Sequence, residues 1–283
     1  MLGLDQIKTQ LLEDKPRLLD HIIHILGDRI GQNKFFSDTE IDWGTSAGVL
    51  MLLGQKRAGT DLGKGPCIVL NKRSLKVRQP GDLCFPGGSM APHIDPYLAH
   101  FFSLPFASLG LWRQWGNWKK NHTRQAKLLS ILWATGLRES FEEMRLNPFG
   151  LRFLGPLPPQ SLVMFRRTIY PMVGWIKRQK RFFPNWEVEK VLYVPLLDLL
   201  NPNYYGRYRL RMGPNPGQGG IESVKDFPCF QLQTQNGKEI LWGATYRITI
   251  DFLESVFDFK PPAIQTPMVI EGTLDETYLN GKR

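Results

Sequence analysis

Apolar residues recur at helical spacing in three parts of the chain. They predict amphipathic helices within residues 4–30, 126–146 and 244–257. Residues three or four positions apart lie on one face of a helix, so each repeat marks a face directed at a core. The repeats that define the first two faces are Leu18, Ile22 and Ile25, and Leu137, Phe141 and Met144.

Short apolar runs between these helices predict strands. Residues 46–54 and 66–72 are apolar runs joined by a glycine-rich segment, which favours a hairpin. Asn236 and Gly237 stand between two β-prone runs and indicate a second hairpin. Three further strand-like runs follow the second helix, at residues 151–157, 166–177 and 188–196.

The 283 residues predict one core domain with appendages. Residues 1–40 form a helical extension, 41–258 the main domain and 259–283 a loosely attached tail. Residues 90–125 interrupt the pattern of the main domain with aromatic residues and a basic run, so they are interpreted as an insertion. Residues 201–225 are rich in Pro, Gly and Asn, which predicts a mobile loop.

The composition narrows the partners and the compartment. A net charge of +10 favours polyanionic partners such as phosphorylated small molecules or anionic membranes, and no nucleic-acid-binding module is recognisable. Three cysteines without metal-ligand spacing argue against a disulfide framework or a zinc site. The N-terminal residues lack the apolar core of a signal peptide, so we expect a cytoplasmic protein.

A cluster of acids on the second helix is the strongest chemical signal. Glu139, Glu142 and Glu143 emerge on one helix face, and Arg138 is placed to orient Glu142. Crowded carboxylates repel one another unless a cation joins them, and hard oxygen ligands suit Mg²⁺ or Mn²⁺. The alternative is an acidic face exposed to solvent.

The residues around this cluster resemble the Nudix box. "FPGG" at 85–88 followed by "RESFEEMRL" at 138–146 is similar to G-x5-E-x7-R-E-U-x-E-E-x-G-U, where U is apolar. The resemblance extends to the coenzyme A pyrophosphatase branch of the Nudix hydrolases through three further segments. They are residues 69–88, similar to the branch signature that ends in F-P-G-G, residues 185–200, similar to N-x-x-E-V with V-P-L, and residues 242–253, similar to its closing helix.

The chain also departs from the pattern. Gly88 and Glu139 lie 51 positions apart where the pattern has 15, so 36 extra residues split the box. Ile94 stands at the position of the first Glu, with Asp95 next to it. Ser140 replaces an apolar residue, and Arg145 replaces the glycine that usually ends the helix.

The resemblance implies an α/β fold, a Nudix-type α/β/α sandwich with a mixed sheet, and hydrolysis of a diphosphate linkage. It implies that Glu139, Glu142 and Glu143, with the carbonyl of Gly88, hold Mg²⁺ or Mn²⁺, and that Glu139 or Glu143 is the base. Cations on the phosphates and an oriented water are what this chemistry requires.

Four residues outside the helix are further candidates. Glu187 is a second candidate base or ligand, and Arg73 and Arg78, with Gly87, are candidates for substrate phosphate binding. Each charged side chain has an alternative role, Glu187 as an exposed strand-edge acid and the arginines as exposed strand-end residues.

Three functions stay open. The first is a hydrolase that converts coenzyme A or an acyl-CoA to phosphopantetheine, or acyl-phosphopantetheine, and adenosine 3′,5′-bisphosphate. The second is a Nudix hydrolase of ADP-ribose, NADH or another nucleoside diphosphate derivative, and the third is a catalytically weak protein that binds CoA or a nucleotide. The aromatic residues 96–120 are interpreted as packing on their own chain or a second copy, contacting a membrane surface, or covering an acyl-pantetheine arm.

Overall fold

The computed structural model of the chain describes residues 4–32, 42–55, 65–162, 166–179, 181–212, 223–234, 237–263, 268–274 and 278. Its helices are α1 (Leu4–Glu13), α2 (Lys15–Gln32), α3 (Asp95–Phe102), α4 (Trp115–Asn121), α5 (Thr123–Met144), α6 (Leu196–Leu199) and α7 (Gly243–Phe257), with 3-10 turns at Pro148–Gly150 and Pro202–Tyr204. Its strands are β1 (Ser46–Gln55), β2 (Pro66–Arg73), β3 (Leu83–Cys84), β4 (Gly87–Ser89), β5 (Leu151–Pro156), β6 (Gln160–Leu162), β7 (Arg167–Ile176), β8 (Val188–Pro195), β9 (Tyr205–Met212), β10 (Ser223–Thr234), β11 (Gly237–Trp242) and β12 (Val269–Leu274).

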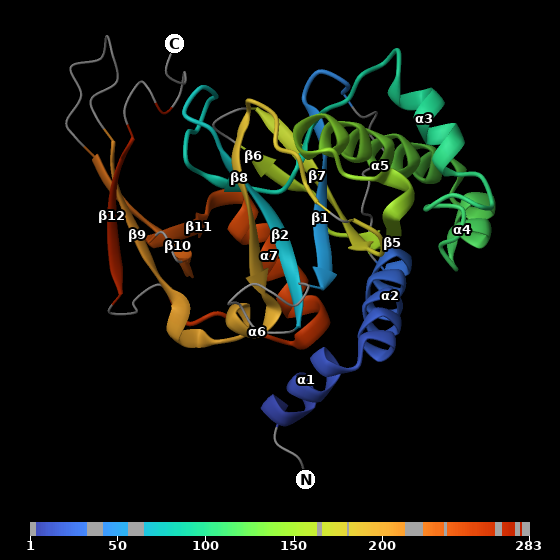
Figure 1. Cartoon of the computed structure of the whole chain (residues 1–283). Helices are drawn as coiled ribbons and strands as arrows, with labels where there is room; N and C mark the ends of the chain where they lie inside the picture. The colour runs from blue at the N-terminus through green and yellow to red at the C-terminus, as the bar shows by residue number, and fades with distance from the viewer. Residues whose placement is uncertain are drawn as a thin grey trace.

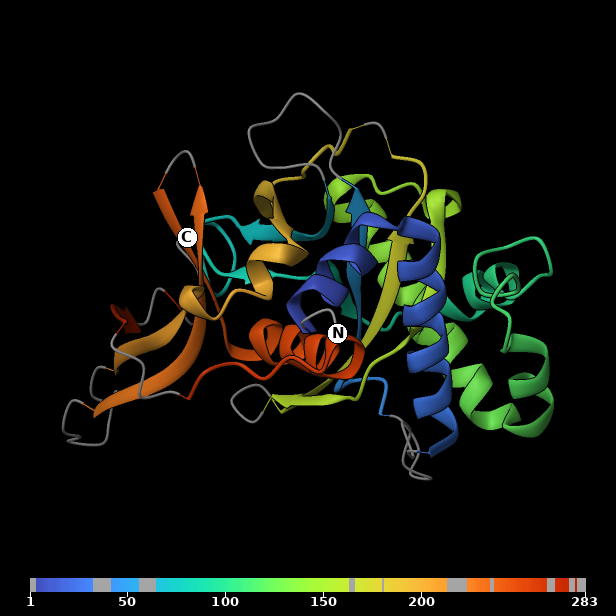
Figure 2. The ribbon, with the colours of Figure 1, turned by 90° about the horizontal axis from the view of Figure 1, so that it is seen from below.

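The larger sheet has β1 at its centre. Its strand order is β3-β2-β1-β7-β5, and β4, β6 and β8 pair with β1, β7 and β2. Since β1 runs parallel to β7 and antiparallel to β2, the sheet is mixed. All of β1 except its last residue is buried, as expected for a strand covered on both faces. Figures 1 and 2 show α5 on one side of this sheet and α7 on the other, so the predicted α/β class is confirmed.

Two glycines bring α5 directly onto the central strand. A Cβ atom at Gly48 of β1 would lie 2.4 Å from the carbonyl oxygen of Leu132, and one at Gly136 of α5 would lie 2.6 Å from Leu50. Larger side chains at either position would separate the helix from the sheet. The close contact fixes where the C-terminal half of α5, with its acids, lies relative to β1.

The predicted helix faces need two corrections. In α2, Leu18 and Ile22 are fully buried, and the next fully buried residue is Leu26, while Ile25 is only half-buried. In α5, Leu137 and Met144 are buried, but Phe141 is 45% exposed. Ser140 takes its place in the core and donates a hydrogen bond to the carbonyl of Gly136 at 2.6 Å. Both the predicted and the observed spacings are compatible with 3.6 residues per turn, so the packing of each helix decides which of two adjacent residues is buried.

The second sheet corrects the expectations for two segments. Its order is β11-β10-β9-β12, and it lies beside the larger sheet (Figure 1). Residues 259–283, expected as a loosely attached tail, contribute β12, which pairs in parallel with β9, and the buried Tyr278. Within 201–225, expected as a mobile loop, residues 205–212 and 223–225 are strand, and 213–222 lie outside the described residues. The pairing of β9 with β10 and β12 holds these segments in place.

Both predicted hairpins are confirmed by antiparallel pairing. β1 pairs with β2, with Gln55 opposite Pro66, and β10 pairs with β11, with Thr234 opposite Gly237. Gly237 has φ of 119°, a value that favours glycine, whereas Asn236 lies outside the described residues. The division of the chain at residues 40 and 258 stays a prediction.

Residues 90–125 pack on their own chain. The side chains of Trp112, Trp115 and Trp118 are buried. Trp112 makes edge contacts with Trp118 and, at 5.0 Å between ring centroids, with Phe153 of β5. The packing interpretation is therefore confirmed, and the three tryptophans do not provide a membrane contact. Of the helices described, none has the length and apolar character needed to cross a membrane.

The end of α5 explains how the helix stops without a glycine. Arg145 adopts the left-handed conformation, with φ of 55°. Its N–H donates to the carbonyl of Phe141, and the N–H of Leu146 donates to the carbonyl of Ser140. The first of these is the bond from the left-handed residue to the carbonyl four positions before it, as in an αL cap. The Arg145 guanidinium lies 5.0 Å from the centroid of the Phe141 ring.

Replacing Arg145 with glycine tests this cap. Arg145→Gly relieves a conformation that costs a non-glycine residue about 1–2 kcal/mol, and it loses an exposed cation–π contact of about 0.5 kcal/mol. We expect the free energy of unfolding, measured by urea denaturation, to rise by about 0.5–1 kcal/mol. Arg145→Ala keeps the strain and loses the contact, so it should not stabilise; equal stability of the two variants would contradict this account.

Candidate active site

The C-terminal half of α5 meets the two glycines of β4. The backbone N–H of Gly87 donates to the carboxylate of Glu143. A Cβ atom at Gly88 would lie 2.5 Å from Cδ of Glu139, so only glycine fits there with the acid in place. Asn71 of β2 donates from Nδ2 to Glu143 Oε2 at 2.7 Å. The structure thus brings the predicted glycine pair and two of the predicted acids together.

Arg138 joins the acids of α5 to the start of α3. Its Nε lies 2.8 Å from Asp95 Oδ1, and its Nη1 lies 2.9 Å from Glu139 Oε1. The contact with Glu142, at 3.5 Å, is the longest. Nη2 also donates to the carbonyl of Ser89 at 3.0 Å. Arg138 therefore orients Glu139 and anchors α3 and β4, rather than orienting Glu142 alone.

Asp95 is a site residue that sequence reasoning undervalued. Its side chain is fully buried, and besides Arg138 it accepts hydrogen bonds from the N–H of Ala91 and the hydroxyl of Thr135. Asp95 stands one position after the acid position of the box pattern, and that adjacency was the available signal. Asp95, although one position beyond the acid position of the pattern, is thus the residue that contacts Arg138.

Glu187 joins the same cluster from the strap of residues 181–187 that precedes β8. The N–H of Asn185 donates to the carbonyl of Glu143 at 2.8 Å, and the N–H of Glu187 donates to the side chain of Asn185 at 2.9 Å. The carbonyl of Glu187 accepts from Ser74 at 2.8 Å. The charge of Glu187 is one of the influences that raise the pKa of Glu143.

The electrostatics of the cluster are dominated by burial. Burial, followed by the charge of Glu139, raises the pKa of Glu143 to about 8. Burial also raises the pKa of Glu139, and the guanidinium of Arg138 opposes that rise. Several acids held together away from water favour a bound proton or a bound cation.

The two predicted phosphate-binding arginines lie at the turn between β2 and β3. Arg73 donates from Nε to the carbonyl of Arg78 at 2.7 Å, and the Arg78 side chain is exposed. The Cys84 thiol, whose pKa burial raises to about 12, is affected by the charges of both Glu143 and Arg73. The Arg73 side chain is thus engaged within its own turn.

The oxygen donors of the cluster fit a hard cation. Asn71 Oδ1 is buried and, among the described residues, has no hydrogen-bond partner. It lies beside Glu143, which the charges of Glu139 and Glu187 affect. Within the described ranges, no three His, Cys, Asp or Glu side chains already stand close enough to form a metal site. Arg138 accounts for part of this, since it engages Glu139 and Glu142.

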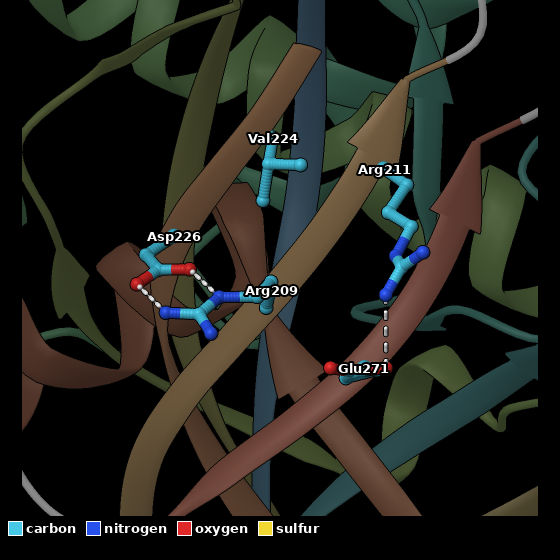
Figure 3. A pocket seen from close by; sticks show the side chains of 5 residues that line it. All are labelled: Arg209, Arg211, Val224, Asp226 and Glu271. Carbon is cyan, nitrogen blue, oxygen red and sulfur yellow. Dashed lines mark hydrogen bonds and ion pairs between the residues drawn. The ribbon is translucent and has the colours of Figure 1, made fainter. Parts of the chain in front are cut away.

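The basic strand β9 faces a shallow depression on the second sheet (Figure 3). The residues that line it are Arg209, Arg211, Val224, Asp226 and Glu271. Arg209 forms two hydrogen bonds with Asp226, at 2.8 and 3.0 Å, and Arg211 lies 3.6 Å from Glu271. These arginines are paired within their own sheet, which favours a solvated strand face over a phosphate site.

Comparisons with known proteins give fold likeness only. No family model matches the chain, and no curated protein matches it. Among solved structures, the Nudix hydrolase RenU from M. smegmatis is 13% identical over 53% of this chain and 70% of its own, with a TM-score of 0.33. An Ap4A hydrolase from C. elegans is 14% identical over 54% and 83%, with a TM-score of 0.35. A MutT/nudix family protein from Enterococcus faecalis is 11% identical over 89% and 78%, with a TM-score of 0.39. Likeness at this level does not assign a family, and the function proposed below rests on the residues of the chain itself.

Substitutions of the two glycines of β4 are expected to have different effects, because a Cβ atom has different neighbours at each position. At Gly87, with φ of 150°, a Cβ atom would lie 2.4 Å from the carbonyl oxygen of Gly48, so Gly87→Ala should lower the free energy of unfolding by about 2 kcal/mol or more.

In Gly88→Ala, the added methyl group contacts only the flexible end of the Glu139 side chain. The variant should therefore stay folded with that carboxylate displaced. Titration with Mn²⁺, followed by electron paramagnetic resonance, should then show roughly tenfold weaker binding. Native-like Mn²⁺ affinity in Gly88→Ala would contradict the placement of Glu139.

Substitutions of Asp95 and Glu142 test which of the ion-pair contacts of Arg138 stabilises the fold. Asp95→Asn removes a fully buried charge that faces a cation, which should cost about 3 kcal/mol of unfolding free energy. Glu142→Gln removes a partner that is 54% exposed, which should cost less than about 1 kcal/mol. Guanidinium denaturation of the metal-free protein measures both, and equal losses would contradict the central role of Asp95.

Proposed function

We propose that the chain is a divalent-metal-dependent hydrolase of a diphosphate linkage, with a Nudix-type site at the C-terminal half of α5. The observation that carries this proposal is the contact between the acidic face of α5 and the glycine strand β4, where Gly88 leaves room for the Glu139 carboxylate and Asn71 donates to Glu143. Glu187 belongs to the strap that bonds to the backbone of Glu143 through Asn185. A structural role alone does not require partly buried acids to lie against paired glycines.

The residues have distinct tasks in this mechanism. Glu139, Glu142 and Glu143, with the carbonyl of Gly88, would hold Mg²⁺ or Mn²⁺, which supplies positive charge to the diphosphate and acidifies a bound water. Glu143 and Glu139 are coupled acids, and the group they form with Glu187 accepts the proton of the attacking water. Arg138 keeps Glu139 in position, while Gly87 and the arginines Arg73 and Arg78 would bind the substrate phosphates.

Coenzyme A or an acyl-CoA is the proposed substrate. Its support is the resemblance of residues 69–88, 185–200 and 242–253 to the coenzyme A pyrophosphatase branch. Cleavage would give phosphopantetheine, or its acylated form, and adenosine 3′,5′-bisphosphate. ADP-ribose, NADH and other nucleoside diphosphate derivatives are the alternative substrates, because the same acid cluster serves any diphosphate.

A second candidate function is a binding protein for CoA or a nucleotide with little catalysis. The observation that favours it is the engagement of Glu139 and Glu142 by Arg138, which leaves no ready-made group of three ligands among the described residues. Metal binding separates the two functions, since a folded protein that binds CoA without metal is not the proposed hydrolase.

The proposed setting is the cytoplasm, where reduced cysteines persist. A membrane surface or a second copy of the chain stays a proposed partner of residues 96–120. Because the three tryptophans are buried, the contact would use the exposed Tyr97, Phe106 and Leu111.

Glu143→Gln tests the proposed chemistry. The native protein, with Mg²⁺ or Mn²⁺, should cleave at least one of CoA, an acyl-CoA, ADP-ribose and NADH, and the variant should lose at least about 100-fold in kcat because its amide cannot accept a proton. Product analysis by mass spectrometry identifies the cleaved bond. Phe106→Ala, an exposed aromatic in residues 96–120, is the control and should keep native kcat.

Different outcomes of this panel select different functions. Cleavage of ADP-ribose or NADH alone would retain the mechanism and exclude the CoA assignment. Binding of CoA or a nucleotide without cleavage and without metal would select the binding protein.

A further inference from the structure

The turn between β2 and β3, residues 73–82, is closed by its own backbone. The N–H of Arg73 donates to the carbonyl of Asp82, and the N–H of Gly81 donates to the carbonyl of Arg73, both at 3.0 Å. The Arg73 side chain spans the turn to the carbonyl of Arg78 at 2.7 Å. Gln79 has φ of 55°, an uncommon conformation for a residue other than glycine. These contacts within residues 73–82 define the shape of the turn.

That support comes from the C-terminal part of the chain. Tyr278 donates from its hydroxyl to Asp82 Oδ2 at 2.5 Å, and its carbonyl accepts from the N–H of Gln79 at 2.7 Å. Trp242, at the end of β11, donates from Nε1 to Asp82 Oδ1 at 3.0 Å. Both oxygens of the Asp82 carboxylate are thus occupied by groups that lie at least 160 positions away in the sequence.

The two donors are themselves held firmly. Tyr278 is only 9% exposed, and its ring centroid lies 6.3 Å from that of Trp242. The Trp242 ring also contacts Tyr208 of β9 at 5.2 Å and Phe227 of β10 at 5.7 Å. The second sheet is therefore the base from which the turn is fixed.

The surface turn is supported through a single carboxylate, that of Asp82. Burial raises the pKa of Asp82, so the charged form is disfavoured by its surroundings and depends on the donors and on the nearby charge of Arg73. Surface turns ordinarily tolerate mobility, and such a connection between two sheets stabilises one geometry of this turn. The side chains that gain from a fixed geometry are those of Arg73 and Arg78.

We propose that Tyr278 and Trp242 are positioning residues that, through Asp82, hold the 73–82 turn so that Arg73 and Arg78 are preorganised for the phosphate groups of the substrate. This inference rests on the function proposed above. The ligand chemistry is a diphosphate, which two guanidinium groups in a fixed arrangement bind with less loss of conformational freedom. Tyr278 then contributes to the substrate site from the C-terminal part of the chain.

Tyr278→Phe is the first test because it removes one hydrogen bond and keeps the ring. We expect KM for the cleaved substrate to rise roughly tenfold and kcat to stay within about twofold, as for a loss of binding alone. Trp242→Phe, which removes the second donor, should act in the same direction. Tyr204→Phe is the control, since the Tyr204 ring packs on Phe230 in another part of the sheet.

A double-mutant cycle separates positioning from general stability. If Tyr278 acts through the turn, adding Tyr278→Phe to a protein that carries both Arg73→Ala and Arg78→Ala should raise KM by less than about twofold beyond the value without it. Independent, multiplicative effects on KM would overturn the proposal, because a merely structural role does not depend on the presence of the two arginines.

Limited proteolysis tests the inference without catalysis. Lys76 and Arg78 are exposed, so trypsin should cut the turn several times faster in Tyr278→Phe than in the native protein or Tyr204→Phe. Binding of inorganic pyrophosphate, measured by calorimetry, should weaken in parallel. Unchanged cleavage and unchanged pyrophosphate affinity in both Tyr278→Phe and Trp242→Phe would overturn the proposal. If the native protein cleaves no substrate, the proposed hydrolysis fails, and these two measurements still decide whether the turn is held for phosphate binding.

Discussion

The buried ion pair between Asp95 and Arg138 is the interaction on which the site depends. A fully buried carboxylate is stable only beside a positive charge, and Arg138 provides that charge from the middle of α5. The same guanidinium holds Glu139 and the backbone of β4. One side chain therefore fixes the relative positions of α3, the glycine strand and the acidic face.

The second constraint on the site is the close packing of α5 against β1 and β4, which glycines allow. Gly48 and Gly136 allow α5 to contact β1 directly, and Gly88 leaves room for the Glu139 carboxylate. At these positions the absence of a side chain decides how near a helix and two strands come to each other. The acid cluster is therefore set by backbone packing as well as by hydrogen bonds, and its geometry follows from the larger sheet rather than from the surface loops.

The sequence predicted the parts of this structure that have a local signature. The acids of α5 and the glycine pair were recognised from spacing, and Glu187 from a short motif. Asp95 was undervalued because its role depends on a one-residue offset that only the fold resolves. Phe141 and Ser140 exchanged places because a helical stripe is set by angle and not by apolarity. β12 and Tyr278 were missed because their partners lie far along the chain, and such pairings leave no mark on a local pattern.

The parallel pairing of β1 with β7 has a consequence for how the protein is made. Ser46 lies opposite Thr168, so more than a hundred residues separate the two strands. At synthesis rates of about 5–20 residues per second, β1 waits on the order of ten seconds for the strand that completes its central position. During that time β2 protects one edge, while the other remains an apolar edge available to wrong partners. Production of the folded protein is therefore expected to depend on temperature and on chaperones that shield nascent chains, more than its final stability would indicate.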